Sequence, residues 1–174
     1  LQDSLDGARI ATVHNGSALF TGNAGGGASN IRQYLIGNDL LEAIIQLPNN
    51  LFYNTGITTY IWVLTNKKTK NRCGKVQLID ASQLYEKLRK NLGAKNCAFT
   101  DPHLRQITRA YLDLLDTGKD AVDGLKSRVF ENREFGYWKV TVERPLRKSA
   151  QFSAGRIAPL RFDKSLGTEM EWIF

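Results

Sequence analysis

The chain has 174 residues, of which 42% are apolar and 24% are charged, which is the composition of a globular protein with a core of its own. This length accommodates one domain, or one domain with an appendage. No run approaches the ~18 apolar residues that a membrane span needs, and the first residues lack a signal-peptide pattern, so a membrane protein is excluded.

The N-terminus and the cysteines indicate the setting of the chain. It begins at Leu1 without Met, so we expect a piece of a longer protein. Cys73 and Cys97 have no His or Cys partner at metal-ligand spacing. They are expected to be free thiols in the reducing cytoplasm, with no metal site. The net charge of +7 is compatible with an anionic partner.

The first predicted elements are a strand, a glycine-rich loop and a helix. Ala8–Val13 is an apolar strand, and His14–Gly27 is a long loop rich in glycine. It leads into a helix predicted over Ala28–Ile36, with Ser29 or Asn30 as its N-cap. The loop matches neither G-x-G-x-x-G nor a P-loop ending in Gly-Lys-Ser/Thr. A flexible lid or an ordered crossover is therefore favoured over a phosphate site.

Three further strands follow. Asp39–Leu47 is a predicted strand, so strand, helix and strand succeed each other as in the βαβ unit of a parallel sheet. Ile57–Leu64 is β-branched and aromatic with almost no charge, which predicts a strand buried on both faces. The loop between these two strands has about nine residues, too few for a parallel crossover, so we expect them to be antiparallel. Gly74–Asp80 is predicted to be the next strand.

The second half of the chain is less regular. Ser82 is expected to cap a short amphipathic helix over 84–88. A longer helix is predicted to start in Thr100-Asp101-Pro102, with Pro at the first helical position, and to run to Gly118. Residues 135–143 read as a strand. The segment 148–174 is weakly patterned and reads as a linker or as an element that a partner orders.

The loop Leu51–Gly56 places two aromatic residues, Phe52 and Tyr53, beside Asn54 and a glycine. Loops normally carry polar turn residues over the surface. Two interpretations are open from these residues alone. Either the rings form a site for a flat ligand at the end of the sheet, or they fold back and plug the end of the core.

Basic residues are concentrated late in the chain, between Lys126 and Lys164. Ten Lys and Arg residues lie there against four acidic ones, and aromatic residues are interleaved with them. This pattern suits contact with nucleic acid. A solvated basic surface around a small aromatic core is equally compatible with it. The residues proposed to contact the DNA backbone are Arg128, Arg133, Lys139, Arg144, Arg147 and Lys148.

Several blocks of the sequence resemble one family. Asp39–Pro48, Leu51–Ile57 and Trp62–Lys67, followed by Val76–Ser82, are similar to the modification subunit of type I restriction-modification systems. The resemblance spans about residues 5–150, and its L-P-x-x-L-F-Y-x-T-G-I block is specific. These subunits are S-adenosylmethionine-dependent DNA adenine N6-methyltransferases. The resemblance implies specificity and restriction subunits as partners, and DNA as the substrate.

The resemblance also implies a fold. We expect an α/β chain holding part of a Rossmann-like methyltransferase sheet, mostly parallel with a late antiparallel strand. The predicted division is residues 1–95 for the downstream half of the catalytic domain, 96–150 for a helix and strand appendage, and 151–174 for a basic tail.

The family's two chemical motifs are missing from this chain. In relatives, N-P-P-[FY] binds the target amine and an acidic glycine-rich turn binds S-adenosylmethionine, but none of the four prolines here forms a Pro-Pro pair. No catalytic or cofactor-binding residue is therefore assigned, and the chain alone is expected to be inactive.

What remains by resemblance is the half that closes over the target base. Adenine is methylated after it is extruded from the duplex, and the extruded ring is held between aromatic or apolar side chains. Phe52 stands where the family places one such aromatic, and Tyr53 is a second candidate. The alternative is a non-catalytic module for DNA binding or subunit assembly on the same half fold.

Overall fold

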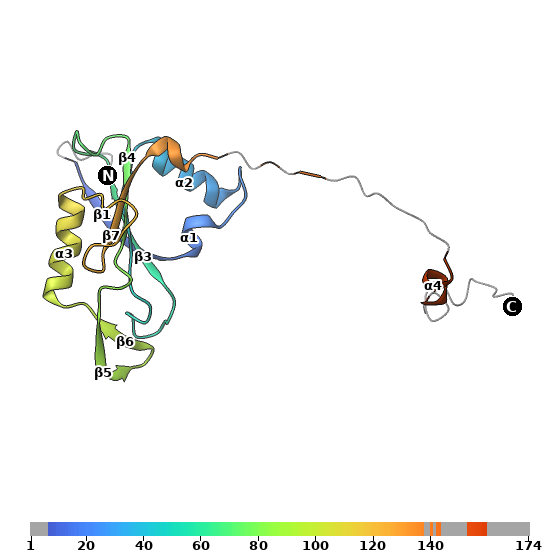
Figure 1. The fold of residues 1–174 in the computed structure, drawn as a ribbon. Coiled ribbons are helices and arrows are strands. Elements are labelled where there is room, and N and C mark those ends of the chain that lie inside the picture. Colours follow the sequence, from blue (N-terminus) through green and yellow to red (C-terminus); the bar gives the residue numbers. More distant parts are fainter. Residues whose placement is uncertain (1–6, 138–139, 141, 144–152, 160–174) are drawn as a thin grey trace. The chain divides into compact units, whose positions relative to one another are not determined.

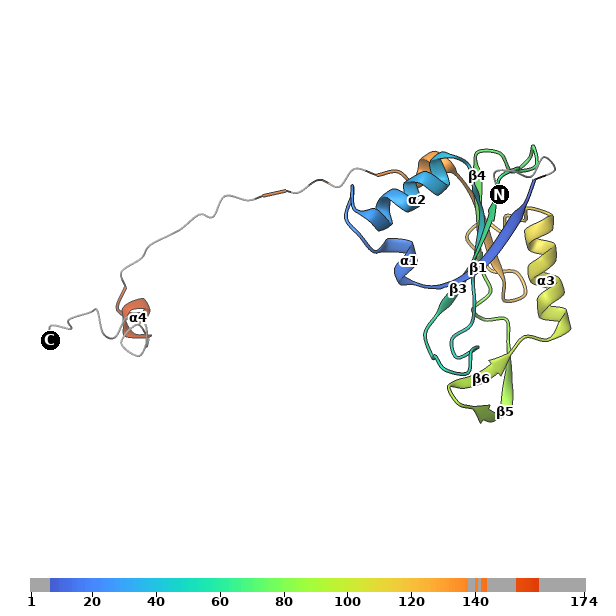
Figure 2. The ribbon, with the colours of Figure 1, turned by 180° about the vertical axis from the view of Figure 1, so that it is seen from behind.

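A computed structural model describes residues 7–137, 140, 142–143 and 153–159 of the chain. The chain divides into two compact units, Leu1–Lys139 and Val140–Phe174. The described part of the first unit contains a five-stranded sheet with helices on both faces and a separate two-stranded hairpin (Figures 1 and 2). In the second unit, the described regular element is α4 (Ala154–Ile157), a single helical turn.

The central sheet has the strand order β1-β3-β2-β4-β7. Strands β1 and β2 both pair antiparallel to β3, β2 pairs parallel to β4, and β7 pairs antiparallel to β4. The strand bounds are Arg9–Asn15 for β1, Leu41–Gln46 for β2, Thr59–Thr65 for β3, Lys75–Asp80 for β4 and Lys126–Glu131 for β7.

This topology confirms the α/β class and the antiparallel pairing of β3 with β2. Strands β1 and β2 point the same way, as a βαβ unit requires, but β3 lies between them. Within this sheet only the β2–β4 pair is parallel, so "mostly parallel" does not describe its strands. The short loop after β2 explains the antiparallel pairing, because so few residues only allow β3 to run back along β2. Strand β4 then starts at the end of the sheet where β2 starts, and so runs parallel to β2.

Helices cover both faces of the sheet. Helices α1 (Ser17–Phe20) and α2 (Gly27–Gly37) lie on one face, and α3 (Asp101–Leu112) lies on the other (Figures 1 and 2). The predicted long helix thus exists but ends at Leu112, because Leu114 adopts a φ of 51°, which is left-handed and stops helical hydrogen bonding.

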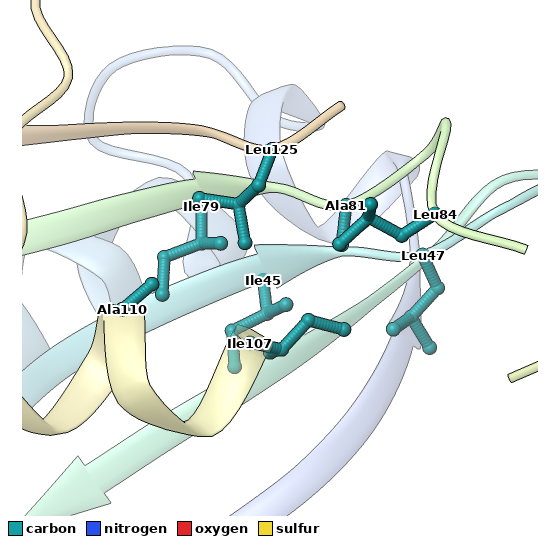
Figure 3. Close-up of a cluster of buried hydrophobic side chains, with 8 residues drawn as sticks. All are labelled: Ile45, Leu47, Ile79, Ala81, Leu84, Ile107, Ala110 and Leu125. Carbon is teal, nitrogen blue, oxygen red and sulfur yellow. The ribbon is translucent and has the colours of Figure 1, made fainter. Parts of the chain in front are cut away.

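The main core lies between α3 and the sheet. Helix α3 inserts Ile107 and Ala110 against Ile45 of β2 and Ile79 of β4 (Figure 3). The same cluster contains Leu47, Ala81, Leu84 and Leu125. Burying each large aliphatic side chain contributes roughly 1.5–3 kcal/mol relative to leaving it in water. The predicted domain boundary at residue 95 lies between β4 and β7 in the sequence, although these two strands are hydrogen-bonded neighbours in one sheet.

A buried polar network joins the end of α3 to the sheet. Glu42 on β2 accepts from Arg9 at 2.8 Å and lies 3.4 Å from the guanidinium of Arg72. Arg72 also donates to the carbonyl of Tyr111 on α3. Burial alone would raise the pKa of Glu42, but the hydrogen bond from Arg9 and the two guanidinium charges outweigh it and lower that pKa.

The helix predicted after Ser82 is wrong. Residues Glu86–Leu92 form strand β5, which pairs antiparallel with β6 (Lys95–Ala98). Leu84 precedes the strand and is buried in the main core rather than on a helix face. Pairing with β6 stabilises the strand conformation of β5, and the spacing of apolar residues along one segment does not reveal such a partner strand.

Two other predictions need correction. The N-cap of α2 is Gly26, not Ser29 or Asn30, and the Asn30 side chain donates to the carbonyl of Gly25 at 3.2 Å. The predicted strand 135–143 begins instead in the 3-10 helix η1 (Asn132–Phe135), and its other described residues have no regular structure. The ring of Phe135 packs edge-on against that of Phe130, with 5.9 Å between the ring centres.

The cysteines are free, as predicted: Cys73 is exposed and Cys97 is buried. Burial raises the pKa of the Cys97 thiol. Among the described helices, none has the length and apolar character to cross a bilayer.

Candidate target-base site

The candidate site lies at the sheet edge where β2 and β4 end. Gln46 and Asp80, the last residues of these two parallel strands, are register partners, and Lys126 at the start of β7 pairs with Asp80. The connection from β2 to β3 leaves from this edge. In open α/β sheets, ligands bind outside the carboxyl ends of the strands, so this connection stands where the fold offers a binding site.

Within that connection, residues 49–58, termed the base loop from here on, expose two aromatic rings. Phe52 is 37% exposed and Tyr53 is 58% exposed. Leu51 instead packs against the main core. The exposure of both side chains favours the ligand-site interpretation over the plug, since the loop side chain that packs on the core is the leucine before them.

The base loop is held by its own polar side chains. Asn50 adopts a φ of 57°, a left-handed conformation that Asn tolerates better than most residues. The Thr58 hydroxyl donates to Asn49 Oδ1 at 2.6 Å, which ties the two ends together. Phe52 and Thr55 form an antiparallel bridge across the tip. Gly56 is required for space, because a Cβ there would lie 2.9 Å from Nδ2 of Asn50.

The β5–β6 hairpin supports the base loop from one side (Figures 1 and 2). The Ala94 amide donates to the Tyr53 carbonyl at 2.8 Å, and the Asn96 amide donates to the Asn50 carbonyl at 3.1 Å. Asn50 Nδ2 returns a hydrogen bond to the Ala94 carbonyl at 2.9 Å. The Cys97 thiol lies 3.2 Å from the Asn49 carbonyl. These contacts satisfy loop backbone groups that would otherwise rely on water.

A charged side chain of the hairpin reaches the second aromatic ring. The Lys95 ammonium lies 5.2 Å from the centre of the Tyr53 ring, within the range of a cation–π contact. Tyr53 is thus partly engaged by the hairpin. Phe52 has no aromatic or cation–π contact within the part of the chain that the structure describes.

The hairpin support was missed by sequence reasoning, although a signal was present. Gly93, between β5 and β6, has a φ of 65°, and a glycine between two residue runs of strand length is a hairpin signal. Because a helix is predicted over 84–88, the same glycine is interpreted as a residue that ends the helix. The site therefore includes the β5–β6 hairpin, for which Gly93 was the one signal in the sequence.

Of the predicted DNA-backbone residues, the structure describes Arg128 and Arg133, and neither lies at the strand ends beside the base loop. Arg133 forms an ion pair with Glu131 at 2.6 Å, and Glu131 is the register partner of Lys75 at the start of β4. That is the opposite sheet edge, about 20 Å away for a six-residue strand. Arg128 lies mid-strand, 4.8 Å from the centre of the Phe130 ring. Lys139, Arg144, Arg147 and Lys148 lie outside the described residues.

A separate cavity of about 480 Å³ lies between the sheet and the α1–α2 face. Its walls are mainly apolar, with Ile44 and Trp62 from the sheet and Ile36 from α2. The buried Trp62 Nε1 has no hydrogen-bond partner among the described residues. Phe52 and Tyr53 are absent from its lining, but Gln46, Asp80 and Lys126 belong to it, so the cavity reaches the strand ends that precede the base loop without including its two aromatic residues.

The residues here do not fit an S-adenosylmethionine site. The glycine-rich segment Gly22–Gly27 contains no carboxylate. Asp80 does follow a parallel strand, but its Oδ1 accepts from the Ser82 amide at 2.9 Å in a turn without glycine. Neither place combines an acid with a glycine-rich turn, so no chemical step of the cofactor is derived from these residues.

Comparison with known proteins decides the family. The model of the N-6 DNA methylase family matches residues 1–134. The chain belongs to the N-6 DNA methylase family. The MjaVII methylase subunit of a type I restriction enzyme from Methanocaldococcus jannaschii is 38% identical over 79 residues, which are 45% of this chain and 13% of that protein. The EcoKI methylase subunit from Escherichia coli is 32% identical over 107 residues, 60% of this chain and 20% of its own length.

Solved structures of such methylases agree with this assignment. The type I methyltransferase subunit from Streptococcus thermophilus has a TM-score of 0.58 at 32% identity, over 72% of this N-6 DNA methylase chain and 23% of that one. The EcoKI M protein has a TM-score of 0.53 at 22% identity, which supports the fold alone. The family predicted from the sequence motifs is thus confirmed, for a chain that spans about an eighth to a fifth of the curated relatives above.

Proposed function

We propose that this chain is the target-base side of a DNA adenine N6-methyltransferase of the type I restriction-modification class. In this proposal the base loop covers one face of an adenine extruded from the duplex, and Phe52 is the stacking ring. The methyl donor is S-adenosylmethionine, bound by residues that this chain lacks. Specificity and restriction subunits are the partners of the whole protein, which acts in the cytoplasm.

One observation carries the proposal. In a chain of the N-6 DNA methylase family, Phe52 exposes its ring at the carboxyl-end edge of the sheet while its own loop is fixed by hydrogen bonds on both sides. An exposed aromatic on a rigid loop loses little conformational entropy on stacking. A flat face held in this way fits a purine ring that has left the duplex.

A second observation fits a sheet that continues beyond these strands. β1 pairs with β3 on one side only among the described strands. It leaves Ile10 and Val13 exposed, although apolar side chains on a strand normally face a core. We therefore place β1 inside a larger sheet of the complete methyltransferase, next to strands that carry the cofactor site.

The test uses the full-length subunit and a duplex in which 2-aminopurine replaces the target adenine. The analogue fluoresces when it is extruded and unstacked, and an aromatic ring stacked on it quenches that emission. We expect wild type to extrude the base with partly quenched emission. Phe52→Ala should give brighter emission, together with target affinity lower by about 5- to 150-fold, the equivalent of roughly 1–3 kcal/mol of stacking.

Phe52→Trp and Tyr53→Ala separate the two rings. A tryptophan restores a π-face, so Phe52→Trp should recover the quenching and most of the methyl transfer. Tyr53 already contacts Lys95, so Tyr53→Ala should change the emission less than Phe52→Ala. Equal emission from wild type and Phe52→Ala would reject Phe52 as the stacking ring and favour a non-catalytic DNA-binding or assembly module.

A further inference from the structure

The β5–β6 hairpin carries a dense positive charge, of which Lys95 alone has a charge contact among the described residues, with the Tyr53 ring. Lys87, Arg89 and Lys90 lie on β5 and Lys95 lies on β6, against a single acidic residue, Glu86. The three β5 cations are exposed and make no ion pair with any other described residue. Buried ion pairing and core packing therefore explain none of them.

The hairpin is also poorly suited to stand as a structural element by itself. A two-stranded hairpin is at best marginally stable in water. Here only Cys97 of its two strands is buried, and the register is irregular between Lys87 and Leu92. Its order depends on the base loop, which it meets through the backbone hydrogen bonds of Ala94 and Asn96.

These contacts make the hairpin and the base loop one rigid unit. The turn that contains Gly93 touches the backbone of Tyr53, since a Cβ on that glycine would lie 2.6 Å from the Tyr53 oxygen. The hairpin backbone that carries the four cations is therefore hydrogen-bonded directly to the loop that carries Phe52. A nucleotide extruded onto Phe52 keeps its own phosphates on either side of it, and the adjoining hairpin offers cations to them.

We propose that the β5–β6 hairpin binds the phosphates that flank the extruded adenine, through Lys87, Arg89 and Lys90. This inference rests on the function proposed above. The hairpin positions the strand so that the base reaches Phe52, while the contacts carry no sequence information. It is separate in sequence from the basic segment Lys126–Lys164, in which Arg133 lies at the opposite end of the sheet although Lys126 pairs with Asp80 at this end.

The test is a double-mutant cycle between protein and DNA charges. The protein variant is the full-length subunit with Lys87→Gln, Arg89→Gln and Lys90→Gln. The DNA variant is a duplex in which neutral methylphosphonates replace the phosphates on both sides of the target adenine. We expect each change alone to weaken binding by about tenfold or more. Combined, they should weaken it hardly further, because both remove the same contacts.

A matched control removes three charges from the other end of the sheet. Lys70, Lys75 and Arg109 are exposed, and Lys70→Gln, Lys75→Gln and Arg109→Gln together change the net charge as much as the hairpin variant does. With this control, methylphosphonate should weaken binding as much as with wild type. In the hairpin variant alone, the slope of the logarithm of the binding constant against log[salt] should become shallower by about 0.9 for each lost phosphate contact. The loss of all three cations should therefore change the slope by about two to three.

A charge-conserving variant controls for effects on folding, and two outcomes would overturn the proposal. The charge-conserving variant Lys87→Arg, Arg89→Lys, Lys90→Arg should bind like wild type, and the glutamine variant should keep the wild-type thermal midpoint. Additive losses in the cycle, or equal salt slopes for the hairpin and control variants, would overturn the hairpin proposal. The Phe52 proposal fails by a different readout, the 2-aminopurine emission, so either can fall without the other.

Discussion

The main-chain nitrogen of Ala94 donates a hydrogen bond of 2.8 Å to the carbonyl oxygen of Tyr53. This bond joins the turn of the β5–β6 hairpin to the tip of the base loop, two segments about 40 residues apart in the sequence. Both aromatic side chains stay exposed, while the loop meets the hairpin through backbone hydrogen bonds, the Asn50 amide and the contact of Tyr53 with Lys95. The position of the rings therefore depends on the hairpin as well as on the core beneath the loop.

Gly93→Ala should impair methyl transfer in the full-length subunit. The new Cβ would meet the Tyr53 carbonyl oxygen at 2.6 Å, so the base loop must shift away from the hairpin. Gly118→Ala is the matched control, because Gly118 has a φ of 69° and a Cβ added there would meet nothing within 4 Å. Each variant should lose about 1–2 kcal/mol of stability from left-handed backbone strain, but Gly93→Ala alone should lose activity. Equal activities would show that the loop position does not depend on the hairpin.

Leu51→Ala and Phe52→Ala should have reciprocal effects. Leu51 packs on the main core, so its truncation should cost about 2–5 kcal/mol of unfolding free energy. Phe52 is 37% exposed, so its truncation should cost clearly less than the ~3–5 kcal/mol of a core Phe→Ala change while lowering target affinity. Chemical denaturation and methyl transfer per folded molecule measure the two effects. If Phe52→Ala strongly lowers the unfolding free energy but leaves methyl transfer per folded molecule unchanged, Phe52 is a packing residue and does not bind the target.

Glu42→Gln should weaken the pH dependence of stability. The pKa of Glu42 is lowered in the folded state, so its ionised form stabilises the fold above the ordinary Glu pKa. That contribution is lost as the pH falls through the lowered pKa. The variant should lose about 3–5 kcal/mol at neutral pH, because Arg72 stays buried without its carboxylate, and should lose less on acidification.

The matched control for this prediction is Glu131→Gln. The ion pair of Glu131 with Arg133 is solvent-exposed, so its loss should cost no more than about 1 kcal/mol. Unfolding free energies from urea titrations between pH 3 and pH 7 give the comparison. Parallel pH curves for wild type and Glu42→Gln would contradict a stabilising carboxylate at this position.

The two cysteines should differ in their reaction with iodoacetamide. Cys73 is exposed and should be alkylated quickly at neutral pH. Cys97 is buried beneath the base loop with a raised thiol pKa, so both access and thiolate population are low there. Mass spectrometry over time should show single alkylation first, and Gly93→Ala should accelerate the second. Equal rates at Cys73 and Cys97 in the wild type would mean that the hairpin opens freely from the loop.

Several features could be predicted from the sequence because local chemistry decides them. The apolar run of β3 and the short loop before it required an antiparallel neighbour of β2, since nine residues cannot cross a sheet. The L-P-x-x-L-F-Y-x-T-G-I block placed Phe52 and Tyr53 in a loop after β2. The family followed from the same block. These conclusions depend on residues close together in the chain.

Tertiary structure alone decided what depends on distant partners. Sequence spacing allowed a helix over residues 84–88, but Leu84 is buried in the main core and Glu86–Leu92 form β5, which pairs with β6. The exposure of Phe52 is decided by Leu51, which fills the core beside α3, and by the hydrogen bonds of Ala94 and Asn96. A residue's own pattern determines which conformations it prefers. Whether its ring is buried or presented to a ligand depends on which long-range contacts satisfy its backbone, and sequence periodicity contains no record of them.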